Sequence, residues 1–580
     1  MLFSDIIATF ELIENTKARN EITQLIAELF KQANSEEAAI VCYLSLGQLW
    51  PPFVNKQLAI GEKIALQAVA ALTGRSEKEI AQMAKKQGDV GLVCQQYEWQ
   101  PVGNPLTIIQ VFQKLIEIAE IQGSGAIDLK IVKLVELLSA HDAVAAKYII
   151  RIILAKLRLG FSDMTLLDAL SVAMTGDKKG REIIENAYNL CADIGMIARN
   201  AKQYGLAYVA QQQIVVGVPI IPAAAERLPT AQAIFDKLGP CVAQPKLDGF
   251  RVQVHINKTD AAPRLSFFSR NLKDMSGMFP DLEAELLKVP VTSIIFEGEA
   301  IVFDQNTKQF LPFQDTVKRK RKYDIDLIAQ EYPLKFFIFD LLFLNGESML
   351  SYSHQMRRQK LQEVCTNYAS DLIQIIDEHP VSDAKALESY FHQMIDVGLE
   401  GIVVKKPAAM YRPGKRDFNW IKLKRQEEGH LEDTIDCVVL GYYKGEGKRA
   451  AFGIGAFLVG IYNKESDCFQ TIAKIGTGLT DQEWCQLKEK ADLVLVNEQP
   501  HNVVCASSLM PDVWVAPEIV CIVRADEITV SPVHTAGKTI DTLGFALRFP
   551  RIMGYRNDKS SFNATTDQEI KRFYEDQFRR

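Results

Sequence analysis

Apolar positions recur at helical spacing through the first third of the chain. Residues 62–74 (EKIALQAVAALTG), 132–160 (VKLVELLSAHDAVAAKYIIRIILAKLRLG) and 165–176 (TLLDALSVAMTG) carry apolar side chains at i, i+3 and i+4. That spacing places them on one face of a helix. The sequence shows no strand-like alternation of any length here, so an all-α domain is predicted over residues 1–213.

The pattern changes at residues 214–226 (IVVGVPIIPAAAE), which carry two prolines and are interpreted as a linker. From 227 to 428, short β-rich runs such as RVQVHI, SIIFEGEAIVF and LKFFIFDLLFL alternate with helical stretches. This is a mixed α+β pattern. From 429 to 580, short strands with glycine-rich turns and a final polar helix are typical of a small β-barrel of the OB type.

The composition is that of a globular protein. At 580 residues the chain has room for three or four domains, and 48% hydrophobic and 24% charged residues exclude a largely disordered, collagen-like or coiled-coil protein. The 66 Lys+Arg and 72 Asp+Glu give a formal net charge of −6, which argues against a basic coat or membrane-surface protein. It does not exclude a nucleic-acid enzyme, because affinity depends on where the charges lie.

Neither the N-terminus nor the cysteines point to export or to a membrane. The first residues lack the basic and apolar regions of a signal peptide. The longest apolar stretch, residues 214–225, is broken by prolines and is shorter than the roughly 20 residues that span a bilayer. The ten cysteines include no C-x-x-C pair, which argues against a disulfide framework and a four-cysteine zinc site. A soluble, cytoplasmic protein is therefore expected.

The sharpest chemical motif is K-x-D-G-x-R, formed by Lys246, Asp248, Gly249 and Arg251. A lysine placed before an Asp-Gly turn and a strand becomes a nucleophile only if its pKa is lowered from about 10.4. Burial and nearby cations lower it, and the cations also suit a phosphate-binding pocket. An ordinary β-turn lysine is the alternative. Chance produces such a motif with odds on the order of one in a few hundred, so its companions must decide.

Further polar motifs follow in order. Alternation places Glu297 and Glu299 on one face of an otherwise apolar strand, where two carboxylates are costly unless they hold a cation or sugar hydroxyls. A salt-bridged Glu297 is an equal alternative. Lys422 and Lys424 likewise share one face of the run WIKLK. The other motifs are Ser269-Arg270-Asn271, Phe336–Asp340, Glu400–Lys405 and Arg556-Asn557-Asp558-Lys559.

Two of these motifs leave alternatives open. Phe339 taken alone is more often a core residue than a ligand contact. Parity places Glu400 and Lys405 on opposite faces of a continuous strand. A bulge or a strand end is therefore needed if both residues reach one site.

In this order the motifs resemble those of the covalent nucleotidyltransferases, and within them the ATP-dependent DNA ligases of the archaeal and eukaryotic replicative type. The helical third resembles the DNA-binding domain of that family, the middle its adenylation domain and the end its OB domain. SRN, PFQDTVKRKRKY and RFPR point to DNA ligases in particular. The resemblance implies sealing of 5′-phosphate/3′-OH nicks in duplex DNA with ATP and Mg²⁺ or Mn²⁺, through lysyl-AMP and a DNA-adenylate.

The resemblance also implies roles for individual residues. Lys246 is the nucleophile, and Asp248 and Asp340 support it. Glu299 and Glu400 are the implied metal ligands. The implied nucleotide-binding residues are Gln244, Arg251, Arg270, Glu299, Phe339, Arg416, Lys422 and Lys424, and the residues that orient the triphosphate are Arg556, Asp558 and Lys559.

One departure from the family pattern concerns the base. The family usually carries Glu two residues before the nucleophile, where it reads the adenine amino group, and this chain has Gln244. A glutamine carbonyl accepts that hydrogen bond, but its amide also donates. Looser base selection is therefore expected.

Basic residues outside the motifs are candidates for DNA-backbone contacts. Lys147, Arg151 and Arg158 follow at spacings of four and seven, which places them on one helix face. The run KRKRK at 318–322 is assigned the same role through Lys318, Arg319, Lys320 and Arg321. A solvated surface is the alternative for both sets. Residues 401–430 hold eight basic and three acidic residues, so DNA binding should use inner faces and be steeply salt-sensitive.

The expected partner is nicked double-stranded DNA. The protein is expected to be a monomer associated with the nucleoid and not to bind membranes. A sliding clamp is a candidate partner, although the sequence contains no recognisable partner-binding peptide. The alternatives are a guanylyl-transferring capping enzyme or RNA ligase, disfavoured by the large helical domain, and an NAD⁺-dependent ligase, disfavoured by the missing paired cysteines. A non-catalytic DNA-binding module would leave the lysine and the paired acids without a role. The strictness for ATP and a role in replication or repair are left open.

Overall fold

The computed structural model describes the chain except residues 17, 57, 260–261, 305–308, 312–315, 317, 320–324, 367, 369, 425–433, 446, 540 and 578–580. The chain divides into two compact units, one of Met1–Ala65 with Trp99–Arg425 and one of Leu66–Glu98 with Gln426–Arg580. The predicted domain boundary between residues 428 and 429 lies outside the described residues. None of the described helices is long and apolar enough to cross a membrane.

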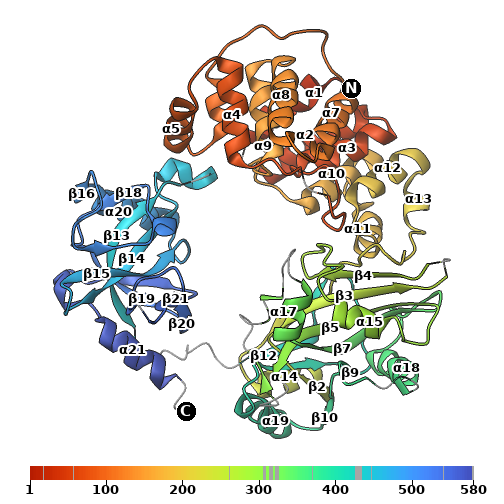
Figure 1. Cartoon of the computed structure of the whole chain (residues 1–580). Helices are drawn as coiled ribbons and strands as arrows, with labels where there is room; N and C mark the ends of the chain where they lie inside the picture. Colours follow the sequence, from red (N-terminus) through yellow and green to blue (C-terminus); the bar gives the residue numbers. More distant parts are fainter. Residues whose placement is uncertain are drawn as a thin grey trace. The chain divides into compact units, whose positions relative to one another are not determined.

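The first third of the chain is helical, as its apolar periodicity predicts. In the described part of residues 1–213 every assigned element longer than a single bridge is a helix (Figure 1). These helices are α1 (Phe3–Asn15), α2 (Arg19–Gln32), α3 (Ser35–Ser45), α4 (Glu62–Thr73), α5 (Glu77–Gln87), α6 (Val90–Gln95), α7 (Ile108–Glu120), α8 (Ala126–Ser139), α9 (Ala143–Ile153), α10 (Asp163–Thr175), α11 (Arg181–Leu190), α12 (Ile194–Tyr204) and α13 (Leu206–Val209).

Residues 214–226 are packed against neighbouring elements rather than free. Ile220 is fully buried, and its N–H donates to Gln253 Oε1 at 2.8 Å. The Ala223 N–H donates to Tyr411 Oη at 2.9 Å. Strand β1 (Ala224–Arg227) begins inside this segment and pairs in parallel with β12 (Arg416–Lys424). The segment interpreted as a linker is therefore ordered, because side chains of neighbouring elements pair its backbone groups.

A five-stranded sheet carries the strand before Lys246, the Glu400–Lys405 motif and the two lysines of WIKLK. Its order is β1-β12-β11-β2-β10, with β11 at Gly401–Lys405, β2 at Cys241–Pro245 and β10 at His379–Val381. One face packs on helices α14 (Ala231–Leu238) and α19 (Ala384–Asp396). The buried residues on that face include Ile402, Val404, Ile421 and Leu423. Residues of the opposite parity, such as Lys422 and Lys424, therefore occupy the other face, as the sequence alternation predicts.

A seven-stranded sheet carries Arg251, the paired glutamates and the Phe336–Asp340 motif. The order β4-β3-β5-β7-β8 is extended by β6 on β5 and by β9, which is parallel to β7. The apolar face includes Val254, Phe296 and Phe336, and helices pack against β7. The strands are β3 (Phe250–Asn257), β4 (Arg264–Ser269), β5 (Ser293–Asp304), β6 (Gln309–Phe310), β7 (Leu334–Leu344), β8 (Glu347–Ser348) and β9 (Ile373–Ile375), and the helices α15 (Pro280–Leu286), α17 (Ile325–Glu331) and α18 (His354–Thr366).

The C-terminal region is rich in β-structure, as predicted. Its larger sheet has the order β16-β18-β13-β14-β15-β17, with β19 joining β13 to β22, and β20 pairs with β21. Helix α21 (Asp567–Asp576) begins after Thr566, whose side chain accepts the Glu569 N–H. The remaining elements are β13 (Ile435–Tyr443), η1 (Gly447–Phe452), β14 (Ala456–Asn463), β15 (Cys468–Ile475), α20 (Asp481–Asp492), β16 (Leu495–Val496), β17 (Val503–Val504), η2 (Ser507–Leu509), β18 (Val513–Val515), β19 (Val520–Arg524), β20 (Glu527–Ser531), β21 (Gly544–Arg548), β22 (Arg551–Tyr555) and η3 (Ser561–Asn563).

Candidate active site

Lys246 lies just beyond strand β2, where its N–H donates to Gly401 O at 2.9 Å. Its Nζ forms an ion pair with Glu400, the residue before β11. Gly401 has φ +139°, and a Cβ there would lie 2.2 Å from Leu423 O, so only glycine fits this close approach. Glu400 therefore reaches Lys246 from a strand end, which answers the parity question for Glu400 and Lys405.

A group of cations surrounds Lys246. Lys424 pairs with Gly401 across the sheet, and its Nζ lies 3.3 Å from Glu400 Oε2. Burial lowers the pKa of Lys422, and the charges of Lys424, Lys246, Arg416 and Arg270 lower it further. The four other predicted cations therefore all lie within electrostatic reach of Lys422. Among the described residues, Glu400 is the carboxylate that forms ion pairs with Lys246 and Lys424, and such an excess of cations suits a polyphosphate.

Two carboxylates of β5 share a face, as predicted, but have different partners. Glu297 is fully buried and accepts hydrogen bonds from Arg251 Nη2 at 2.8 Å and from Tyr411 Oη at 2.7 Å. It is therefore the salt-bridged residue of the two. Glu299 accepts the Gly249 N–H at 3.2 Å, and burial raises its pKa to about 7 against the opposing charges of Lys246 and Arg251.

The glycine of the K-x-D-G-x-R motif is required by packing. A Cβ on Gly249 would lie 2.3 Å from Ala300 O of β5. That contact is closer than any side chain tolerates, so a larger residue would push the turn away from β5. Because the Gly249 N–H also holds Glu299, the same turn sets the distance between Lys246 and this carboxylate.

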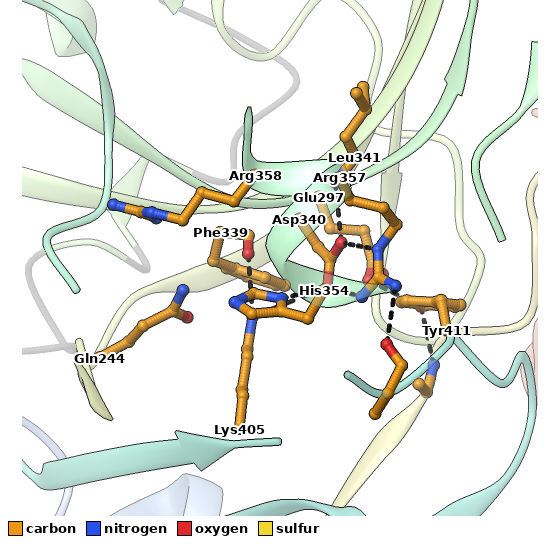
Figure 2. Close-up of polar contacts among 12 residues, drawn as sticks. Gln244, Glu297, Phe339, Asp340, Leu341, His354, Arg357, Arg358, Lys405 and Tyr411 are labelled. Carbon is orange, nitrogen blue, oxygen red and sulfur yellow. Dashed lines mark hydrogen bonds and ion pairs between the residues drawn. The ribbon is translucent and has the colours of Figure 1, made fainter. Parts of the chain in front are cut away.

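Asp340 lies at the centre of a buried ionic network (Figure 2). Arg357 donates to both of its oxygens, at 2.6 and 2.9 Å, and Lys405 Nζ lies 3.7 Å away. Despite burial, Arg357 and Lys405 hold the pKa of Asp340 well below its usual range. Lys405 also donates to Phe339 O at 2.8 Å, which joins the two sheets.

Phe339 is partly exposed beside this network. Its ring meets Trp420 edge-on at 6.1 Å between centroids, and the Arg251 guanidinium lies 5.4 Å from it. The two site sheets thus meet around an aromatic pair. The exposed part of the ring leaves room for the nucleotide contact that the resemblance implies.

The sequence reasoning missed His354, Arg357, Glu378 and Tyr411 as members of the site. Arg357 and His354 lie on α18, in a polar stretch without a distinctive pattern. The available signal was Asp340 itself. A buried carboxylate inside an apolar strand needs a cation, but alternation along that strand does not identify the cation.

The predicted triphosphate-orienting residues form a group within the C-terminal unit. Arg556 donates to both oxygens of Asp558 at 2.8 Å. Lys559 Nζ donates to Asp436 Oδ2 at 2.6 Å, and Arg556 Nη1 lies 3.4 Å from the same atom. The motif is therefore prearranged around two carboxylates.

The prediction that Lys147, Arg151 and Arg158 line one exposed helix face is wrong. Helix α9 ends at Ile153, so Arg158 lies outside it. Lys147 and Arg151 are 4% and 3% exposed, and both form ion pairs with Glu14 of α1, at 3.1 and 3.0 Å. Every residue from Ala145 to Ile153 is buried, and α1 packs against the side of α9 that carries Lys147 and Arg151.

In the basic run at 318–322 the structure describes Lys318 and Arg319, and only one of the two is exposed. Arg319 is 2% exposed, and its Nη2 donates to Asp281 at 2.5 Å, so its placement as a surface residue is wrong. Lys318 is exposed and donates to Tyr332 Oη at 3.1 Å. Lys320 and Arg321 lie outside the described residues.

Three family models match the chain in order: the DNA ligase N terminus over 2–171, the ATP dependent DNA ligase domain over 222–424 and the ATP dependent DNA ligase C terminal region over 450–559. A probable DNA ligase of Dictyoglomus thermophilum is 44% identical over 579 residues, which are 100% of this chain and 98% of the relative. DNA ligase 2 of Thermofilum pendens is 37% identical over 586 residues, a match that covers 98% of this chain and 96% of the relative.

The solved structure Pmar-Lig_PreS3 is 17% identical in sequence to this chain. The match covers 95% of this chain and 99% of the solved one, and its TM-score of 0.57 shows a common fold. The resemblance inferred from the motifs and the three-part architecture, helical at the start and β-rich at the end, are both confirmed. Since full-length relatives are 37–44% identical to it, the chain belongs to the ATP-dependent DNA ligase family.

Proposed function

We propose that Lys246 is the nucleophile that accepts AMP from ATP in this ligase and passes it to the 5′-phosphate of a nick. The single observation that carries the assignment is the position of its amine, which pairs with Glu400 and lies within electrostatic reach of Glu299 and of Lys422. In-line attack on the α-phosphate forms the phosphorus–nitrogen bond, and pyrophosphate leaves with the broken phosphorus–oxygen bond. The 3′-OH then attacks the DNA-adenylate and releases AMP.

The carboxylates fit a divalent cation of the Mg²⁺ type. The described residues contain no group of three or more His, Cys, Asp or Glu side chains able to hold a metal. Mg²⁺ needs no such group, because one or two carboxylates, waters and substrate phosphates complete its shell. Glu299 and Glu400 would hold it, and Mn²⁺ fits the same donors. When bound, the cation would offset the negative charge of these carboxylates and of the substrate phosphates.

The two lysines of β12 supply charge for the leaving pyrophosphate and for the α-phosphate. Replacing Lys422 or Lys424 with alanine should slow lysyl-AMP formation about 10²- to 10³-fold, the range found when one electrostatic donor is lost from an active site. Single-turnover labelling with α-labelled ATP measures this rate. Lys415→Ala is the matched control, because Lys415 is an exposed lysine just before the same strand. Equal rates for all three variants would contradict the assignment.

We further propose that the substrate is nicked duplex DNA, that the enzyme acts as a monomer, and that the C-terminal unit is an OB-type barrel whose Arg556, Asp558 and Lys559 orient the triphosphate. The cytoplasmic location and a clamp partner stay predictions. A nick-sealing gel with ATP tests the function directly. Absence of sealing by protein that still forms lysyl-AMP would point to a different acceptor, such as RNA.

Binding to nicked DNA should depend steeply on salt. The chain has a net charge of −6, so the attraction between protein and DNA phosphates comes from local clusters such as the basic residues of 401–430. Binding then releases counterions from the DNA, which makes the affinity depend on salt. Between 50 and 200 mM salt, affinity should fall by about 10³-fold or more if six phosphates are neutralised. Fluorescence anisotropy with a nicked duplex measures the slope, and a flat response would contradict the proposed use of basic inner surfaces.

A further inference from the structure

Gln244 and Glu378 stand opposite each other where β2 meets β10. His379, the first residue of β10, pairs with Ala243 in this antiparallel register, which brings Glu378, the residue before β10, beside Gln244. Gln244 is 1% exposed, and its Nε2 donates to Glu378 Oε2 at 2.9 Å. At position 244, where the family usually has Glu, this chain therefore has a glutamine whose side chain faces the acid Glu378.

The surroundings of Glu378 decide which end of the Gln244 amide faces it. His354 Nε2 lies 2.8 Å from Glu378 Oε2, and Arg358 Nε lies 3.6 Å from Oε1. His354 and Arg358 hold the pKa of Glu378 below its usual range, although burial opposes them. An ionised carboxylate only accepts hydrogen bonds, so the NH₂ group of Gln244 must face it. Figure 2 shows Gln244 near Arg358 and His354, the two residues that share Glu378 with it.

The carbonyl oxygen of Gln244 is consequently left for another partner. It accepts no hydrogen bond from the part of the chain that the structure describes. Gln244 and Lys246 have the same strand parity, and Gln244 pairs with Val403, which in turn pairs with Lys422. Gln244 therefore lies on the face of the sheet that carries the nucleophile, opposite the apolar face under α14 and α19.

We propose that Glu378 is a positioning residue that sets base selection: it holds the Gln244 amide with its carbonyl oxygen toward the nucleotide, where it accepts a hydrogen bond from the 6-amino group of a purine. A 6-oxo purine would place an acceptor against this acceptor and is rejected. The inference rests on the proposed placement of the nucleotide at Lys246. Base selection is then strict, in contrast to the looser selection expected from Gln244 alone.

The arrangement also gives a physical reason for glutamine at position 244. A glutamate there would put two carboxylates at a hydrogen-bond distance in a buried place, which strongly disfavours both being ionised. Exchanging the two residues would restore one amide and one carboxylate. The pair should therefore behave as a coupled unit, in which each single change costs more than the double change.

The test compares Glu378→Gln, Gln244→Glu and the double variant in full-length protein. The measured quantity is the ratio of lysyl-nucleotide formation from α-labelled ATP and from α-labelled ITP, whose base carries a 6-oxo group. Glu378→Gln, which lets the Gln244 amide turn, should lower the ATP:ITP ratio at least tenfold. Gln244→Glu should slow labelling by ATP at least tenfold. The double variant should return to within about threefold of the parent in rate and ratio.

An unchanged ratio in Glu378→Gln, or a double variant no better than Gln244→Glu, would overturn the inference. Glu388→Gln is the matched control, an exposed glutamate on the neighbouring helix α19. Thermal melting of each variant measures its folding. Both labelling rates are measured on the same preparation, so a general loss of folded protein does not alter the ATP:ITP ratio. Failure of the proposed function would instead appear as labelling that survives the loss of the Lys246 amine, whatever the ATP:ITP ratio.

Discussion

Replacing Lys246 with arginine should abolish the transfer of label from α-labelled ATP to the chain. Arginine keeps the positive charge that pairs with Glu400, so the fold and the electrostatics of the site are retained. A guanidinium remains protonated in proteins and offers no lone pair for attack on phosphorus. The expected labelling is below one part in about 10⁴ of the parent, since the covalent intermediate cannot form. Gel autoradiography after incubation with the nucleotide and Mg²⁺ measures it.

The same variant should still seal a nick that already carries AMP. That final step needs the 3′-OH and the cations around the phosphate, and it does not use the lysine as a nucleophile. Lys406→Arg serves as the control for both assays, because Lys406 is exposed one residue beyond β11. Persistent labelling of Lys246→Arg, with Lys406→Arg unchanged, would show that another residue is the nucleophile.

Replacing Asp340 with asparagine should destabilise the protein by about 3–5 kcal/mol, the usual cost of removing one partner from a buried ion pair. Asp340 is 3% exposed, and Arg357 and Lys405 depend on its charge. Burial already lowers the pKa of Lys405 to about 8, and without Asp340 that pKa should fall further. At about 2–4 °C per kcal/mol for a region of roughly 200 residues, the melting temperature should fall by about 6–20 °C.

The effect of pH separates the charge of Asp340 from its shape. Because its pKa in the folded protein is well below the unfolded value of about 3.9, its stabilisation is complete above that value and is lost as the pH falls toward the folded pKa. The melting temperatures of the parent and Asp340→Asn should therefore converge below about pH 4. Asp371→Asn, at an exposed site, is the control. A constant difference down to pH 3 would mean that packing, not charge, is responsible.

The sequence by itself determined those features that depend on neighbours along the chain. The helical first third follows from apolar spacing of 3.6 residues, and the shared face of Lys422 and Lys424 follows from strand alternation, which the buried Ile421 and Leu423 confirm. The order of the motifs was sufficient to recognise the ligase family. In each case the governing geometry lies within a few residues, so the pattern is readable without the fold.

Only the tertiary structure decided which partner each charged residue has. Glu297 and Glu299 have the same parity, yet Arg251 and Tyr411 hold the first, whereas the second faces Lys246. Lys147 lies beside Glu14, 133 residues earlier, which turns an apparent DNA-binding face into a buried ion pair. Gln244 faces Glu378, 134 residues later. Pairing over such separations is set by how helices and strands pack, and backbone periodicity carries no information about it.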